Sequence, residues 1–338
     1  MTDPLSPAGD RVGCSTTGRF APSPTGRLHL GNLRTAIIAW LWTRSEGGRF
    51  LVRMEDLDRV TSRRHFEVEQ LRELAALGLD WDGDVVRQSD RFDRHHQVID
   101  DLTDKGLTYP CYCSRREIVE AASAPHGSPG RYPGTCRDLD RSGRRRRSSS
   151  GRPPALRFRS TAEPVAVVDE VLGPLVGTPD DVVVRRGDGV PSYHLAVVVD
   201  DADQGVDLVV RGDDLAPATP SQVALGVASG LAIPRYGHVP VLRNIRGERL
   251  AKRDGAVTLE EQTALGRSTV EVLAQLLRSC RILRPDHLDA TTLDSFGTTA
   301  AGRLLDAALG DFDPRVVRDA STIWPWTFTD DVVPPRGK

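Results

Sequence analysis

The sequence has no long hydrophobic run and few cysteines. Its longest apolar stretch, residues 36–42, is far too short to span a bilayer. The first residues include Asp3, Pro4 and Asp10 and lack the apolar centre of a signal peptide. The five cysteines, three of them clustered, are more typical of a metal site in a reducing compartment than of a disulfide framework. We therefore expect a cytoplasmic protein that does not associate with membranes.

Lysine is almost absent, because Lys105, Lys252 and Lys338 are the only lysines among 45 basic residues. The formal net charge of -2 excludes a general attraction to nucleic acid, so any such contact needs a local basic patch. Walker A and G-x-G-x-x-G motifs, two common phosphate-binding signatures, are also absent from the sequence. A chain of 338 residues is long enough for two or three domains, and nothing in it requires more than a monomer.

Alternating strand and helix patterns predict an α/β fold with a Rossmann-type parallel sheet. A cysteine-bearing stretch rich in Gly, Pro, Arg and Ser interrupts this alternation, which indicates an inserted α/β subdomain, and the C-terminal part has mainly helical patterns. We expect a flexible leader, the first half of the sheet domain, the insert, the second half and a C-terminal extension at residues 1–16, 17–100, 101–185, 186–257 and 258–338.

Apolar patterns place the main elements within these segments. β-prone or continuous apolar runs predict strands at residues 49–53, 195–199 and 207–211. Helical spacing predicts one helix that buries Val68, Leu71, Leu74 and Ala75 and ends at Gly78, a second at residues 220–229, and further helix at residues 258–283.

Two distant segments carry the strongest chemical pattern. Residues 18–32 combine a β-prone run, a Pro/Gly-rich turn and then His29, Gly31 and Asn32 at the start of an apolar helix. Such a turn directs backbone N–H groups and the positive end of a helix at an anion. Lys252 lies in a polar loop, from which a mobile cation can reach the same anion.

These segments resemble the H-I-G-H and K-M-S-K-S signatures of class I aminoacyl-tRNA synthetases. Gly26-x-x-His29-x-Gly31-Asn32 and Arg249-Leu250-Ala251-Lys252-Arg253 are similar to the forms in the glutamyl and glutaminyl branch, with Ala251 in place of Ser. The resemblance implies adenylation of an amino acid by ATP with Mg²⁺. By the same resemblance, His29, Gly31, Asn32 and Lys252 bind ATP, and His29 and Lys252 are the catalytic pair. Positioning and electrostatics then supply the catalysis without a covalent nucleophile.

A second group of candidates lies near the ends of predicted strands, where open α/β sheets bind ligands. Residues 53–58, 193–201 and 205–214 resemble segments of the same branch. The resemblance places the amino acid against Arg19, Phe20, Ala21, Pro22, Ser23, Glu55, Tyr193 and Arg211. An acidic amino acid needs arginine for its side-chain carboxylate and an acid for its ammonium group, so two arginines and one glutamate favour L-glutamate over glutamine.

The cysteines Cys111, Cys113 and Cys136 lie in the predicted insert, in a pattern typical of zinc. From residue types alone, His126 would complete a common set of three Cys and one His. The family resemblance points instead to Tyr132, which we favour while His126 stays open. A site closed by four ligands predicts one structural Zn²⁺ with no part in the chemical step.

The acceptor of the activated glutamate is a separate question. The residues after 257 are too few for the anticodon-reading domains of a full glutamyl-tRNA synthetase. This brevity, and the segment Asp203-Gln204-Gly205-Val206, resemble the glutamyl-Q tRNA(Asp) synthetase family. That family activates glutamate without tRNA present and esterifies it to the queuosine base at the wobble position of tRNA(Asp).

Three alternatives stay open for the acceptor. They are a short glutamyl-tRNA synthetase that charges tRNA(Glu), glutamate activation for an acceptor other than tRNA, and a synthetase relic that only binds tRNA. A relic predicts loss of His29 or Lys252, and the sequence retains both. The run Arg144–Arg147 either contacts tRNA phosphates or forms a solvated, disordered loop.

Overall fold

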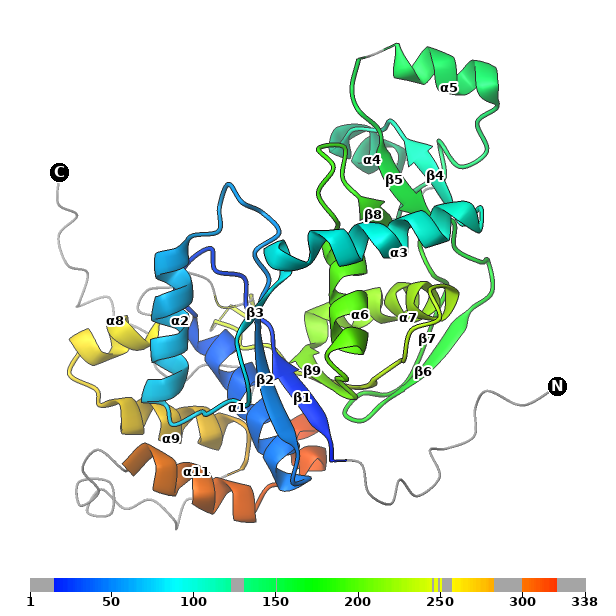
Figure 1. Ribbon diagram of the computed structural model, residues 1–338. Coiled ribbons are helices and arrows are strands. Elements are labelled where there is room, and N and C mark those ends of the chain that lie inside the picture. Colours follow the sequence, from blue (N-terminus) through cyan, green and yellow to red (C-terminus); the bar gives the residue numbers. More distant parts are fainter. Residues whose placement is uncertain are drawn as a thin grey trace, which may run out of the picture.

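The structure is a computed structural model of the chain, shown in Figure 1. It describes residues 15–122, 131–149, 151–244, 246–248, 250, 257–282 and 300–320. Within these ranges, no helix is both long enough and apolar enough to cross a bilayer.

A seven-stranded sheet forms the centre of the fold. Its strands, in spatial order, are β3 (Val86–Arg87), β2 (Arg49–Met54), β1 (Thr17–Phe20), β9 (Leu208–Gly212), β10 (Arg235–Val239), β6 (Val165–Asp169) and β7 (Gly173–Gly177). Neighbouring strands are parallel except for the β6–β7 hairpin, which is antiparallel. The parallel sheet confirms the predicted α/β fold, and the strands predicted at 49–53 and 207–211 are β2 and β9.

Helices and short 3-10 turns make up the rest of the regular structure. The helices are α1 (Leu30–Ser45), α2 (Arg64–Ala76), α3 (Phe92–Asp104), α4 (Arg115–Ala122), α5 (Arg141–Ser148), α6 (Tyr193–Asp203), α7 (Thr219–Ala228), α8 (Leu259–Ala264), α9 (Thr269–Ser279) and α11 (Ala300–Gly310). The 3-10 turns are η1 (Gln88–Arg91), η2 (Asp213–Ala218) and η6 (Pro314–Asp319).

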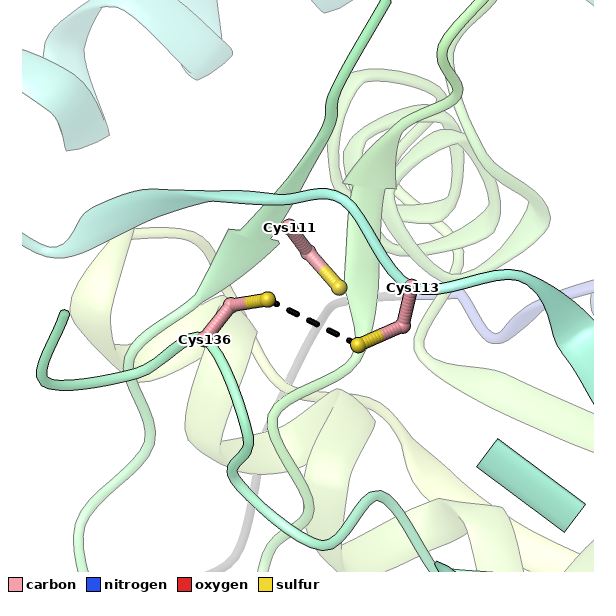
Figure 2. A group of neighbouring side chains, drawn as sticks. All are labelled: Cys111, Cys113 and Cys136. Carbon is pink, nitrogen blue, oxygen red and sulfur yellow. Dashed lines mark hydrogen bonds between the residues drawn. The ribbon is translucent and has the colours of Figure 1, made fainter. Parts of the chain in front are cut away.

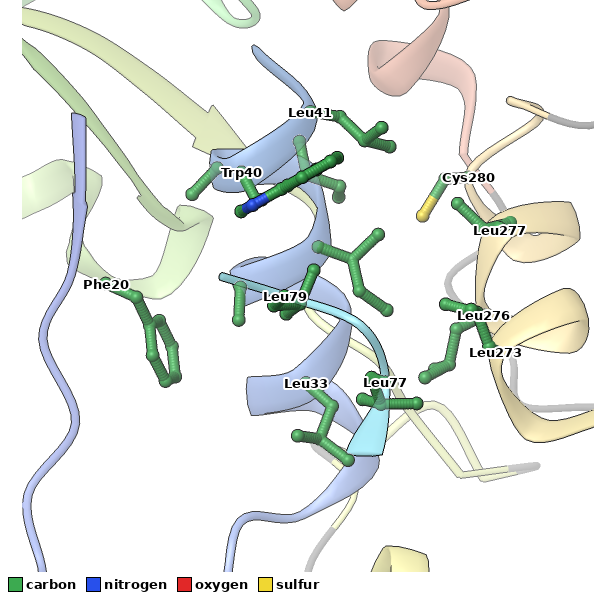
Figure 3. Close-up of a cluster of buried hydrophobic side chains, with 14 of the residues drawn as sticks. Phe20, Leu33, Trp40, Leu41, Leu77, Leu79, Leu273, Leu276, Leu277 and Cys280 are labelled. Carbon is green, nitrogen blue, oxygen red and sulfur yellow. The ribbon is translucent and has the colours of Figure 1, made fainter. Parts of the chain in front are cut away.

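Helix α1 forms the centre of the largest hydrophobic core. It packs closely on β1, because a Cβ atom on Gly18 would lie 1.9 Å from Thr43 Oγ1. On its other side, Leu273, Leu276 and Leu277 of α9 point toward it (Figure 3). Because α1 is covered on nearly all sides, it is apolar all round rather than amphipathic.

The C-terminal helices belong to this same core. Helices α9 and α11 contact each other and α1, and α11 contributes the buried side chains of Leu304 and Leu305. Figure 1 shows α8, α9 and α11 gathered beside α1 and α2. The residues after 257 that the structure describes are therefore helical, as predicted, and complete the packing around α1.

A smaller antiparallel sheet lies beside α3, as Figure 1 shows. Its strands, in spatial order, are β4 (Thr108–Cys111), β5 (Ala155–Phe158) and β8 (Val183–Arg185). The segment that we predicted as an insert is divided between the two sheets, because β6 and β7 pair with β10 in the larger one.

The strand predicted at residues 195–199 is wrong, since these residues lie in α6. Ser192 caps this helix by accepting a hydrogen bond from the backbone N–H of Leu195. Leu195 and Val199 pack into a core with α3 and α7, and residues 195–201 are all buried. A helix buried on all sides gives the same continuous apolar run as a buried strand, so the pattern could not separate the two.

Candidate active site

A cavity of about 200 Å³ lies where the carboxyl ends of β1, β2 and β9 meet the first turn of α1. These three strands are neighbours in the sheet, so residues at their ends come together from distant parts of the sequence. Among the predicted residues, those lining the cavity are Arg19, Phe20, Ala21, His29, Gly31, Asn32, Glu55, Tyr193 and Arg211.

The first turn of α1 forms one wall of the cavity. His29 is the N-cap of α1, and its Nδ1 accepts a hydrogen bond of 3.2 Å from the backbone N–H of Asn32. Since Nδ1 accepts, a neutral His29 ring carries its proton on Nε2, which is a donor. A Cβ atom at Gly31 would lie 3.0 Å from Nδ1, so glycine leaves room for this ring. The turn thus joins a ring donor with the positive end of a helix.

Polar residues of α2 hold the loop that leads into α1. Gln70 Nε2 donates to the carbonyl oxygens of Ser23 and Gly26, at 3.0 and 2.7 Å. The backbone N–H of Leu28 donates to Glu73 Oε2 at 3.1 Å. These side chains fix a loop that has no regular hydrogen-bonded structure of its own.

This arrangement corrects the predicted face of α2. Val68 and Ala75 are exposed, whereas Glu67, Gln70, Glu73 and Leu74 are buried. The apolar spacing was misleading because polar residues of α2 are buried against polar groups: Gln70 and Glu73 bind the loop backbone, and Glu67 binds Arg87. Nothing in the local pattern of α2 indicates these contacts.

Charged residues behind the cavity form a buried cluster. Asp201, on α6, accepts hydrogen bonds from Arg19 Nε at 3.1 Å and from Arg53 Nη1 at 2.8 Å. Burial alone would raise the pKa of Asp201, but the two guanidinium groups hold it below its usual range. Asp201 therefore stays ionised and fixes the position of Arg19 at the cavity wall.

Glu55 follows β2 directly and faces this cluster. Its Oε1 lies 3.7 Å from Arg53 Nη2, and its side chain is 11% exposed. Burial raises the pKa of Glu55 to about 7, although Arg53 and Arg19 oppose the rise. A carboxyl group with this proton affinity is prepared to ionise fully when a cation enters the cavity.

Tyr193 and Arg211 also line the cavity. Arg211 lies in β9, near the end of a strand as predicted, whereas Tyr193 is the first residue of α6 and not at a strand end. Arg211 donates to His238 Nε2 at 3.0 Å and to Thr219 Oγ1 at 2.9 Å. Burial raises the pKa of Tyr193, which keeps its phenol protonated.

Some predicted residues do not line the cavity. Pro22 and Ser23 contribute backbone contacts instead: the Pro22 carbonyl accepts from the N–H of Glu55 at 2.9 Å, and the Ser23 carbonyl accepts from Gln70. Several lining residues were in turn not assigned from the sequence, namely Thr35, Val210, Gly212, Asp214, Leu215, Val241 and Leu242. Val210, Gly212 and Asp214 lie within residues 205–214, which resemble a segment of the family, so that resemblance could have identified them.

Lys252 lies outside the described residues, but the residues on either side of its loop are anchored beside the cavity. The backbone N–H of Leu250 donates at 2.9 Å to the carbonyl of Leu242, which lines the cavity. Beyond the loop, the carbonyl of Val257 accepts at 2.7 Å from the N–H of Leu30 in the first turn of α1.

The three predicted zinc ligands of cysteine type lie together, with their sulfur atoms within 4.8 Å of one another. Figure 2 shows Cys111, Cys113 and Cys136 pointing toward a common centre, and Cys113 Sγ is 3.6 Å from Cys136 Sγ. Zn–S bonds of about 2.3 Å place tetrahedral sulfur ligands about 3.8 Å apart. The three thiols therefore fit a zinc ion with little movement.

Tyr132 occupies the remaining side of this cluster. Its phenol oxygen lies 3.3 Å from Cys111 Sγ and 3.8 Å from Cys113 Sγ, and it accepts from the N–H of Cys136 at 2.8 Å. Arg157 Cζ lies over the Tyr132 ring, 3.7 Å from its centre. Burial and the hydrogen bond with Cys111 raise the pKa of Tyr132, so zinc has to displace the phenol proton when it binds. His126, the other candidate for the fourth ligand, lies outside the described residues.

The arginine run is helical, which excludes the disordered loop, one of the two alternatives left open for it. Asp140 caps α5 by accepting from the N–H of Gly143 at 2.6 Å. Arg144, Arg145 and Arg146 are exposed, whereas Arg147 pairs with Glu117 at 3.2 Å. Within the described residues, the first three form no salt bridge, so α5 presents a local positive surface.

Comparison with known proteins gives the family. The family described as tRNA synthetases class I (E and Q), catalytic domain, matches residues 15–280. A relative from Nocardia farcinica (strain IFM 10152), named glutamyl-Q tRNA(Asp) synthetase, is 53% identical over 93% of this chain and 93% of its own length. A relative of the same name from Symbiobacterium thermophilum is 47% identical over 77% of this chain and 84% of its own length.

A solved structure shows the same fold. The glutamate-tRNA synthetase from Elizabethkingia anophelis has a TM-score of 0.75 and 21% identity, over 92% of this chain and 68% of that chain. The family match covers residues 15–280, and the alignment with the Nocardia farcinica relative covers 93% of the chain. The chain therefore belongs to the glutamyl-Q tRNA(Asp) synthetases, a family built on the class I (E and Q) tRNA synthetase catalytic domain.

Proposed function

We propose that the protein activates L-glutamate with ATP, without tRNA present, and then transfers the glutamyl group to the queuosine base at the wobble position of tRNA(Asp). The observation that carries the activation step is one cavity lined by Glu55, Arg19, Arg211 and His29. The names of the relatives support the choice of acceptor. We place this reaction in the cytoplasm and assign it to a monomer.

The sheet side of the cavity recognises glutamate. The carboxylate of Glu55 pairs with the ammonium group, and Arg211 pairs with the side-chain carboxylate. Arg19, fixed by Asp201, adds a second positive charge for the same carboxylate. Phe20, Ala21 and the ring of Tyr193, which line the cavity, limit the length of the amino acid that fits. The α-carboxylate is then left to face the first turn of α1.

The α1 side of the cavity receives ATP. Gly31 offers its backbone N–H at the positive end of the helix, and His29, whose ring is held by the N–H of Asn32, offers Nε2–H. An oxygen of the glutamate α-carboxylate attacks the α-phosphorus, the bond to the β-phosphate oxygen breaks, and pyrophosphate leaves. His29 and Lys252 stabilise the negative charge that builds on the phosphate oxygens. Mg²⁺, bound with ATP, neutralises part of the same charge.

The transfer step consumes the adenylate. A hydroxyl group of the queuosine base attacks the glutamyl carbonyl, the bond to AMP breaks, and an ester forms. Within the described residues, this scheme needs no side chain as a covalent nucleophile, because orientation of the two substrates supplies the catalysis.

The zinc site has a structural part in this scheme. Cys111, Cys113, Cys136 and Tyr132 would hold one Zn²⁺, which would join the end of β4 to the segment before α5. The ion stabilises the small sheet and stays out of the chemical step.

Helix α5 provides the positive surface that an RNA partner requires. Arg144, Arg145 and Arg146 are exposed on a chain whose net charge is only -2, so they form a local basic patch of the predicted kind. We assign this patch to the phosphates of tRNA, which it contacts without reading sequence.

Amino-acid-dependent exchange of labelled pyrophosphate into ATP tests the activation step. We expect exchange with L-glutamate in the absence of RNA, and at least about tenfold less with L-glutamine or L-aspartate, since a misplaced or missing carboxylate forfeits a charge-assisted bond. The absence of exchange with glutamate would refute the proposed enzyme, and equal exchange with glutamine would refute the assigned pocket.

A further inference from the structure

Three neighbouring strands carry a continuous hydrogen-bonded chain that ends at Arg211. Asp169 is the last residue of β6, His238 lies in β10, and Arg211 lies in β9. His238 and Arg211 are direct partners in the β9–β10 register. Within the described residues, Arg211 is the only member of this chain that lines the cavity. The other two therefore act on a substrate only through it.

Asp169 determines which nitrogen of His238 carries the proton. The Asp169 carboxylate accepts from the backbone N–H groups of Val171 and Leu172, at 3.0 and 2.8 Å, and from His238 Nδ1 at 2.6 Å. Burial would raise the pKa of Asp169, but these donors hold it below its usual value. An ionised carboxylate only accepts, so His238 Nδ1 must donate.

His238 then presents Nε2 to Arg211 as an acceptor. Arg211 Nε donates to this nitrogen at 3.0 Å, and Arg211 Nη2 donates to Thr219 Oγ1 at 2.9 Å. Burial, with Arg211 beside it, lowers the pKa of His238, which keeps the ring neutral. Two of the three guanidinium nitrogens are thus held in place. Within the described residues, Nη1 has no protein acceptor and is the nitrogen left for a ligand.

We propose that His238, held in one tautomer by Asp169, is a positioning residue that orients Arg211 toward the side-chain carboxylate of the amino acid. A guanidinium fixed in advance loses no side-chain entropy when it binds a carboxylate. Its hydrogen bonds to a charged carboxylate are also stronger than those to the neutral amide of glutamine. The chain Asp169–His238–Arg211 therefore contributes to selection of glutamate over glutamine. This inference rests on the proposed glutamate-activating function.

A second buried His–Asp pair provides the matched control. His95 Nε2 lies 2.8 Å from Asp200 Oδ1, and both side chains are fully buried, as are those of His238 and Asp169. Neither His95 nor Asp200 lines the cavity. When His95 alone is replaced, Asp200 keeps its hydrogen bonds from Gln88 and Arg91, so His95→Asn reports what an equally buried histidine contributes to stability.

Two substitutions of His238 separate its two hydrogen bonds. In His238→Asn, the shorter amide can still donate to Asp169, but it cannot reach Arg211. In His238→Gln, the amide oxygen lies near the former position of Nε2 and can accept from Arg211. We expect KM for glutamate in pyrophosphate exchange to rise about 10- to 100-fold in His238→Asn, with kcat and KM for ATP within about twofold of wild type.

We expect His238→Gln to recover most of the lost affinity, and we expect the preference for glutamate over glutamine to fall in His238→Asn but not in His95→Asn. A KM for glutamate in His238→Asn that equals the wild-type value would overturn the inference. So would a His238→Gln variant as impaired as His238→Asn, or a His95→Asn variant with the same rise in KM. A wild-type protein without glutamate-dependent exchange would refute the proposed function, and this inference with it.

Asp169→Asn tests the tautomer directly. An amide can turn its N–H toward Nδ1, which moves the His238 proton to Nε2 and sets it against the donor Arg211 Nε. Correlation of the ring ¹⁵N and ¹H signals of His238 distinguishes the two tautomers in the folded protein. We expect the Nδ1–H form in wild type, the Nε2–H form in Asp169→Asn, and a raised KM for glutamate in that variant. A changed tautomer with an unchanged KM, or the reverse, would overturn the assigned role of Asp169.

Discussion

Buried charges beside the cavity determine the position of Arg19 and the ionisation of Glu55. Arg19 and Arg53 share the carboxylate of Asp201, and Glu55 lies at the edge of this cluster. Burial raises the pKa of Glu55 to about 7, and Arg53 and Arg19, which donate to Asp201, oppose this rise only in part. The same cluster fixes Arg19 and makes Glu55 responsive to an incoming cation.

Glutamate binding should depend on pH through Glu55. In the free cavity the pKa of Glu55 is about 7, and pairing with an ammonium group requires the ionised form. Below pH 7 a proton must be released on binding, so KM for glutamate should rise about tenfold for each unit of decrease. Above pH 7 it should be nearly constant.

Pyrophosphate exchange between pH 5.5 and 8.5 measures this dependence. Glu55→Gln should raise KM at every pH and remove the slope below pH 7. A wild-type slope that persists in Glu55→Gln would assign the titration to another group and contradict the role of Glu55.

Lys252→Ala should reduce the rate of adenylation about 100- to 1,000-fold, since it removes one cation from the developing charge on the phosphates. The fold and the zinc content should not change. Lys105→Ala is the matched control, because Lys105 is exposed and its Nζ donates to the carbonyl of Ala228 at 3.3 Å, away from the cavity. Stopped-flow or exchange rates decide the matter, and a fully active Lys252→Ala variant would remove Lys252 from the mechanism.

Several individual residues could be identified from sequence because they lie in dense motifs. His29, Gly31 and Asn32 occur together at a strand-to-helix turn, and Glu55 and Arg211 adjoin apolar runs. Asp201 and His238, the partners of Arg19 and Arg211, could not be assigned in this way. They approach Arg19 and Arg211 only after the sheet has formed, and the local sequence around them gives no indication of the pairing.

Continuous apolar runs identified two buried strands correctly and one buried helix wrongly. Strands β2 and β9 and helix α7 occur where the patterns indicated. Helix α6 was mistaken for a strand because it is buried all round, and α2 was given the wrong face because its buried side chains bind a loop backbone. In both cases the deciding contact is tertiary, so a local period does not contain it.

The predicted zinc site lies at the end of β4, where Cys111 and Cys113 meet Cys136. Tyr132→Phe should lower zinc affinity at least about tenfold and reduce the midpoint temperature of unfolding, because the metal then lacks its oxygen ligand. Cys113→Ser should have the larger effect on both quantities. His126→Ala should leave them unchanged.

Zinc content after dialysis against a chelator, followed by thermal unfolding, measures these effects. Cys280→Ser is the control for loss of a buried thiol, since Cys280 is fully buried outside the cluster. A Tyr132→Phe protein with full zinc content, together with a depleted His126→Ala protein, would assign the fourth ligand to His126.

Helix α5 should contribute to RNA affinity through charge alone. Replacing Arg144, Arg145 and Arg146 with Ser should weaken tRNA binding at low salt. It should also reduce the slope of log affinity against log salt by about 0.7 to 0.9 for each phosphate that the helix no longer neutralises. Pyrophosphate exchange without RNA should not change.

A double substitution of exposed arginines elsewhere, Arg278→Ser with Arg303→Ser, is the control on α9 and α11. Filter binding or anisotropy across a salt series gives both slopes. Equal slopes for the wild type and the α5 variant would show that α5 does not contact the RNA backbone.

At the scale of the whole molecule, one core supports the site from behind. Helices α9 and α11 pack on α1, whose first turn carries His29, Gly31 and Asn32, so the C-terminal helices stabilise the side of the cavity that we propose binds ATP. The segment at Val257 and Thr258 is bound directly to the start of α1. The sequence predicted helices here, but their packing against α1 became visible only in the structure.

The identity of the acceptor is the central claim, and one measurement tests it most directly. Labelled glutamate and ATP are offered with queuosine-containing tRNA(Asp), with its unmodified transcript and with tRNA(Glu). We predict label on the queuosine-containing tRNA(Asp) alone. Label on tRNA(Glu) instead would contradict this claim and make the protein a short glutamyl-tRNA synthetase, while glutamate activation without label on any of the three would assign the adenylate to an acceptor other than these tRNAs.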